Sequence, residues 1–88
     1  MAISDDISNQ VIEEAIKLLG RDSFTTFNLI TILEQNYGEL VSDIKNWSER
    51  NWRAIIGKAI KRYSVETNKI RQVSPASETP ARWKKVII

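Results

Sequence analysis

The segment SERNWRAIIGKAIKRYS, residues 48–64, carries five basic residues after its only early acid, Glu49. With a helical turn of about 100° per residue, one side of this segment is apolar: Trp52, Ile55, Ile56, Ala59, Ile60 and Tyr63. The other side holds Arg50, Asn51, Arg53, Gly57, Lys58, Lys61 and Arg62. Guanidinium and ammonium groups on one helical face can bind phosphates or carboxylates, although such a face is often only solvated.

The charges of the chain are divided unevenly between its halves. Residues 1–49 hold three basic and nine acidic residues, a formal charge of −6, whereas residues 50–88 hold ten basic and two acidic residues, +8. An asymmetry of this kind favours a basic face directed at a polyanion. The other interpretation is that the two halves of one small domain attract each other.

The composition argues against catalysis. The chain has no histidine and no cysteine, so the usual general base, thiol nucleophile and transition-metal ligands are missing. The acidic pairs Asp5–Asp6 and Glu13–Glu14 are adjacent in sequence, and adjacent residues on a helix point about 100° apart. We therefore expect no enzyme activity, no catalytic residue, no cofactor and no metal site.

The pattern of apolar residues predicts one domain over residues 1–88, with two helices in its first half. The first helix is expected to begin near residues 4–6 and to end at Gly20, which suits a left-handed C-terminal residue. Residues 23–25 are expected to form a short extended piece. A second helix, capped by Thr25 or Thr26, should then run to Gly38, and residues 38–47 should connect it to the basic segment.

The start of the basic helix is predicted at Ser48, a good N-cap residue. Trp47 before it is expected to pack on Trp52 as a hydrophobic staple. After Thr67 the period becomes extended: KIRQV and RWKKVII are predicted strands, with SPASETPA as the loop between them. Trp83 is expected in the core and to share a strand face with Ile87.

This order of elements resembles a winged helix-turn-helix DNA-binding domain, with SERNWRAIIGKAIKRYS as the recognition helix and IRQVSPASETPARWKKVI as the wing. The resemblance implies an α+β fold of three helices followed by a C-terminal two-stranded hairpin, with a short extra strand near Ser23–Thr25. The recognition helix would span residues 48–64 and the wing residues 69–88. Two features depart from the family: the connector is longer than a compact helix-turn-helix turn, and the wing lacks a glycine at its tip.

The resemblance also assigns roles to the polar residues. The recognition helix enters the major groove, so Arg50, Asn51 and Arg53 would read base edges, and Ser48 with the first-turn amides would hold a phosphate. Further contacts to the DNA backbone would come from the remaining cations: Lys58, Lys61, Arg62, Lys69, Arg71, Arg82, Lys84 and Lys85. Gly57, in a helix interior, indicates either close approach of DNA to the helix or contact with another part of the fold.

Double-stranded DNA is thus the expected partner, for a small transcriptional regulator or another DNA-associated protein in the cytoplasm or at the nucleoid. The main alternative is a protein-interaction module that uses its basic or its acidic face. RNA or single-strand binding is a weaker alternative, because the tryptophans are expected to be buried and stacking needs free rings. A homodimer through the acidic N-terminal half stays open, and no segment predicts membrane insertion.

Overall fold

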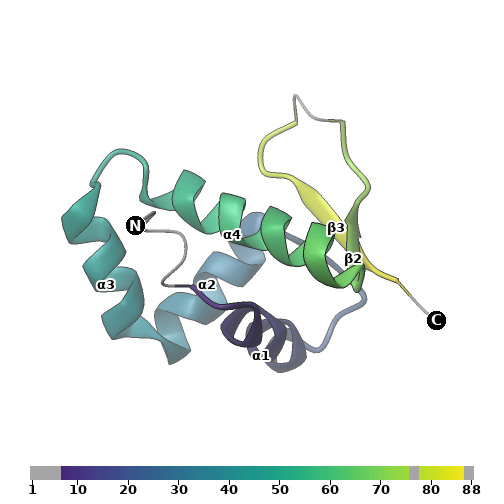
Figure 1. Ribbon diagram of the computed structural model, residues 1–88, viewed down its shortest axis with the longest axis horizontal. Coiled ribbons are helices and arrows are strands. Elements are labelled where there is room, and N and C mark those ends of the chain that lie inside the picture. Colours follow the sequence, from purple (N-terminus) through teal and green to yellow (C-terminus); the bar gives the residue numbers. More distant parts are fainter. Residues whose placement is uncertain (1–6, 76–77, 87–88) are drawn as a thin grey trace.

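The computed structural model describes residues 7–75 and 78–86 of the 88-residue chain. These residues form a small α+β fold with four helices and three strands. In chain order the elements are α1 (Asn9–Leu19), β1 (Ser23–Thr25), α2 (Thr26–Asn36), α3 (Gly38–Trp47), α4 (Trp52–Thr67), β2 (Ile70–Gln72) and β3 (Arg82–Lys85). Figure 1 shows α3 at one end of the long axis and the β2–β3 hairpin at the other, with α4 running between them.

The caps of the first two helices follow from the sequence. The Ser8 side chain accepts a hydrogen bond from the amide of Val11, and Gly20 adopts the expected left-handed conformation, with φ of 67°. The predicted helix start near residues 4–6 is wrong, because Ser8 is extended and α1 begins at Asn9. Thr25 caps α2 in a reciprocal box with Asn28, as expected from its hydroxyl.

The predicted connector over residues 38–47 is wrong, because this segment is a helix. Only Tyr37 separates α2 from α3. Val41 and Ile44 lie three residues apart, share one helical face and are buried. Their burial holds a short helix in place although its N-cap, Tyr37, makes no side-chain capping bond. The fold therefore has one helix more than the three that were expected.

The predicted start of the basic helix is also wrong. Ser48 ends α3, where its amide donates to the carbonyl oxygen of Ile44 at 2.9 Å, and α4 begins four residues later at Trp52. The Trp47 staple is absent, since Trp47 is 66% exposed whereas Trp52 is 7% exposed. The helix then continues to Thr67, three residues beyond the expected end.

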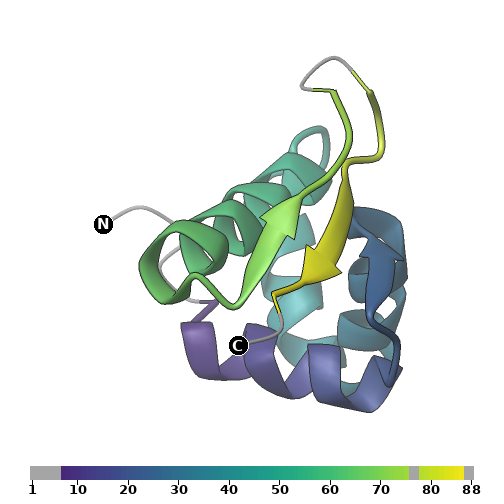
Figure 2. The ribbon, with the colours of Figure 1, turned by 90° about the vertical axis from the view of Figure 1, so that its right-hand side faces the viewer.

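The three strands form one antiparallel sheet in the order β1-β3-β2. The short strand expected at Ser23–Thr25 and the C-terminal hairpin are both present. Phe24, Ile70 and Trp83 are buried on the inner face of the sheet against the helices, and Figure 2 looks onto the opposite, outer face. Trp83 was expected to share a strand face with Ile87, but Ile87 lies outside the described residues.

Candidate nucleic-acid interface

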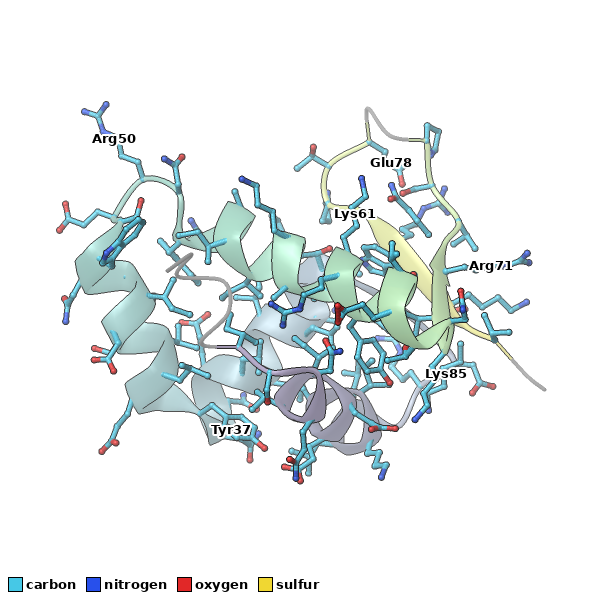
Figure 3. The ribbon with its side chains drawn as sticks, in the orientation of Figure 1. Tyr37, Arg50, Lys61, Arg71, Glu78 and Lys85 are labelled. Atoms are coloured by element: carbon cyan, nitrogen blue, oxygen red, sulfur yellow. The ribbon has the colours of Figure 1, made fainter. Side chains whose placement is uncertain are left out.

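The long helix α4 separates its apolar and basic residues as the sequence predicts. The six apolar residues expected on one side are all buried: Trp52, Ile55, Ile56, Ala59, Ile60 and Tyr63. On the exposed side lie Arg53, Lys58 and Lys61, which we call the α4 ridge. Figure 3 shows Lys61 projecting away from the core, next to the loop that joins β2 and β3.

The charge of the α4 ridge is not neutralised within the part of the chain that is described. Neither Lys58 nor Lys61 makes an ion pair with a described residue. The one acid in α4, Glu66, is turned toward α1, where it accepts a hydrogen bond from the Asn9 amide at 2.9 Å. The ridge therefore presents positive charge to solvent.

Arg53 is held in position by the indole beneath it. Its guanidinium carbon lies 4.4 Å from the centroid of the Trp52 ring, and the Lys45 ammonium lies 4.5 Å from the same ring. Such cation–π contacts favour a defined side-chain direction. Lys45 is also ion-paired with Glu34 at 3.1 Å. Of the two cations that contact the Trp52 ring, Arg53 is therefore the one without an acidic partner among the described residues.

Arg50 and Asn51 are exposed in the α3–α4 loop rather than on the first turn of the helix. Figure 3 shows Arg50 extending from this loop, at the end of α4 opposite the sheet. Both residues thus stay beside the N-terminal end of α4, where base contacts were expected. Ser48 is half-buried and caps α3 instead.

Two residues assigned to the basic face lie against other parts of the fold. Arg62 is half-buried: its guanidinium donates to the carbonyl oxygen of Ile7 and, at 3.4 Å, to the side-chain oxygen of Asn9. It thereby fastens the segment before α1 to α4. Gly57 faces α2, because a Cβ placed on it would lie 4.0 Å from the Thr26 methyl group.

The cations of the hairpin divide into paired and unpaired groups. Lys69 is paired with Glu13 at 2.6 Å, and Arg82 with Glu78 at 2.7 Å. The bond from Lys69 is the main reason that the pKa of Glu13 is lowered. Arg71, Lys84 and Lys85 make no ion pair with a described residue.

Two features of the surface escaped the sequence interpretation. Trp47 is exposed on α3, at the far end of the molecule from the sheet. Arg21 lines a hollow beside β1 together with Arg82. The signal for Arg21 is its place two residues before the strand predicted at residues 23–25, which brings it to the sheet.

The described residues contain no group of three or more His, Cys, Asp or Glu side chains that could hold a metal ion. None of the helices in the described ranges is long and apolar enough to cross a membrane.

No protein-family model, no curated protein and no solved structure matches this chain.

Proposed function

We propose that this protein binds double-stranded DNA as a small winged-helix module, with the α4 ridge in the major groove and contacts from the hairpin, the wing, to the backbone. The observation that carries the proposal is the α4 ridge itself: three exposed cations without an acidic partner among the described residues, beside a hairpin rich in further cations. A helix of 16 residues is about 24 Å long, and the major groove, about 12 Å wide, admits an α-helix.

Some of these residues are placed to contact base edges, and others to contact phosphates. Arg50 and Asn51 precede α4 and Arg53 lies on its first turn, and the N-terminal part of a recognition helix is the part that meets base edges. Lys58 and Lys61 lie further along, where phosphate contacts fix orientation without reading sequence. Arg62 is excluded from this proposal because its guanidinium bonds the segment before α1.

The additional helix is a departure from the expected plan. Since α3 stands between α2 and α4, the helix that precedes α4 is α3 and not α2 as expected, and residues 48–51 join α3 to α4. The proposal rests on the α4 ridge and the adjacent hairpin, and the observed order helix, strand, helix, helix, basic helix, hairpin supports it. We propose in addition that the protein regulates transcription or serves another DNA-associated role, in the cytoplasm or at the nucleoid.

The test is a titration of a fluorescent duplex of about 30 base pairs at several salt concentrations. Each phosphate neutralised contributes about −0.9 to the slope of log K against log salt. The Lys58→Ala/Lys61→Ala variant should therefore have a slope shallower by about 1.8, with weaker binding. Lys17→Ala, which removes an exposed cation on α1, is the control and should bind like the wild type.

Absence of duplex binding by the wild type at low salt would overturn the proposal. An unlabelled single strand of the same length, added as competitor, addresses the RNA or single-strand alternative: it should displace the duplex only weakly.

A protein partner is the second candidate, favoured by the surface of α3. Trp47 is 66% exposed on this helix, together with the exposed acids Glu39 and Asp43. An exposed aromatic residue of this kind is typical of protein interfaces. If α3 serves a separate protein contact, Trp47→Ala will leave duplex affinity unchanged.

A further inference from the structure

The outer face of the sheet carries a row of three polar residues, one from each strand. Lys84 of β3 is the direct partner of Ser23 in β1 and of Arg71 in β2. Directly paired residues project to the same face of a sheet, and all three are exposed. The row thus offers a hydroxyl, an ammonium and a guanidinium group side by side.

This row contains an unfavourable contact that an anion would relieve. Arg71 and Lys84 are like charges placed directly opposite each other, which destabilises a strand pair. Neither makes an ion pair with any residue in the described ranges. The arrangement is therefore better suited to a state in which a negative group lies between them.

The surface on both sides of the row is hollowed, and the hollow on the β2 side is basic. One hollow of about 310 Å³ is lined by Arg71, Lys84, Lys85 and Val86. A second, of about 230 Å³, lies on the β1 side, where Arg21 and Ser23 contribute to its wall beside Arg82, which is paired with Glu78. No acidic side chain is among the described residues that line either hollow. Three cations around one hollow, with Arg21 on the β1 side, fit a polyanionic backbone better than a single small ion.

The row faces a different direction from the α4 ridge. In Figure 3, Lys61 projects upward from α4 while Arg71 projects sideways beyond the sheet. Figure 2 shows the strands in front of the helices, with α4 beside the sheet. A straight duplex seated on the α4 ridge would therefore not cover the outer face of the sheet.

We propose that the outer face of the sheet is a second phosphodiester-binding site, centred on Ser23, Lys84 and Arg71, and that it binds nucleic-acid backbone other than the segment seated on the α4 ridge. This inference rests on the proposed function. The phosphodiester comes either from the same duplex, bent around the hairpin, or from a second duplex bridged by the protein.

The deciding variant is Lys84→Glu, with Lys17→Glu as a control of equal charge change. The carboxylate introduced by Lys84→Glu would lie opposite Arg71, so the like-charge pair becomes an opposite-charge pair and the hairpin should be at least as stable as in the wild type. Thermal unfolding checks this point. The salt slope of duplex binding should become shallower by about 0.9 or more for Lys84→Glu than for Lys17→Glu.

Two further measurements on the same variants separate the sources of the phosphodiester. Fluorescence transfer between dyes at the two ends of the duplex rises on binding if the duplex bends. Capture of a free labelled duplex by an immobilised one reports bridging. Whichever signal the wild type gives should be lost in Lys84→Glu and kept in Lys17→Glu.

The inference is overturned if Lys84→Glu and Lys17→Glu have equal salt slopes and the wild type neither bends nor bridges DNA. It is also overturned if the protein self-associates without DNA in low-salt sedimentation and Lys84→Glu abolishes this, because the row then binds the acidic surface of a second copy. In either case the proposed function stands if Lys58→Ala/Lys61→Ala still weakens binding, and it fails separately if that variant has no effect.

Discussion

The indole Nε1 of Trp83 donates a hydrogen bond of 3.0 Å to the hydroxyl oxygen of Thr26, and both residues are buried. This bond joins the inner face of β3 to the first residue of α2. The Thr26 amide donates in addition to the carbonyl oxygen of Ala81 at 3.0 Å. The hairpin, which presents the cations of the outer sheet face, is thereby fixed to the helices.

The first prediction concerns the hydroxyl of this bond. Thr26→Val keeps the shape of the side chain but leaves the buried Trp83 N–H without its acceptor, which should lower the free energy of unfolding by about 1–3 kcal/mol. Urea unfolding followed by circular dichroism measures the change. Trp83→Phe removes the donor, so the Thr26→Val/Trp83→Phe double variant should lose less than the sum of the single variants. Strict additivity would show that the bond contributes nothing.

Helical periodicity explains which parts of this fold were predictable. The apolar stripe of α4 and the hydroxyl of Thr25 each specify local structure, and both lie where they were expected. The segment that became α3 carries Leu40, Val41, Ile44 and Trp47 at the spacing of a helix, so its periodicity does indicate a helix. Its start is hidden because the segment begins with glycine and has no capping side chain.

The candidate site was predictable to the same extent. Periodicity places Lys58 and Lys61 on the exposed side of α4, as the structure has them. A helical wheel cannot show which polar positions are covered by another element. Arg62 and Gly57 were therefore assigned to the basic face, although one bonds the segment before α1 and the other faces α2.

The second prediction is that Gly57→Ala stabilises the protein. Glycine in a helix interior costs roughly 0.5–1 kcal/mol relative to alanine. The added methyl group would have its nearest neighbour at 4.0 Å, an ordinary contact distance. Chemical denaturation should show a gain of up to about 1 kcal/mol, with duplex affinity unchanged. A stable variant that loses affinity would instead mean that DNA approaches the helix backbone at this position.

The third prediction concerns the pH dependence of the Lys69–Glu13 pair. Its hydrogen bond lowers the pKa of Glu13 and raises the pKa of Lys69. The contribution of Glu13 is therefore present above the ordinary pKa of a glutamate, about 4.3, and is lost as the pH falls through its lowered value. The contribution of Lys69 is present below the ordinary pKa of a lysine, about 10.4, and is lost as the pH rises through its raised value.

Glu13→Gln should accordingly be less stable than the wild type near neutral pH and lose that difference in acid. Urea titrations at neutral pH and well below the ordinary glutamate pKa measure it. Asp43→Asn is the matched control, because Asp43 is exposed and makes no ion pair with a described residue. If both variants show the same pH profile, the ion pair has no specific effect on stability.

The fourth prediction assumes that the protein binds DNA. It distinguishes a hydrogen-bonding contact between Arg53 and a base from the effect of the positive charge of Arg53. The guanidinium group stacks on Trp52 at 4.4 Å, and an arginine fork can contact guanine through two hydrogen bonds. Lysine keeps the charge but cannot reproduce this planar geometry. Arg53→Lys should therefore retain the salt slope of the wild type while losing about 1–3 kcal/mol of discrimination at one base pair. The measurement uses a preferred duplex, selected from a randomised pool and then substituted one base pair at a time. Arg53→Ala should lose both the salt slope of the wild type and the discrimination at that base pair. Full discrimination retained by Arg53→Lys would show that Arg53 contacts phosphate and that the reading of bases belongs to Arg50 and Asn51.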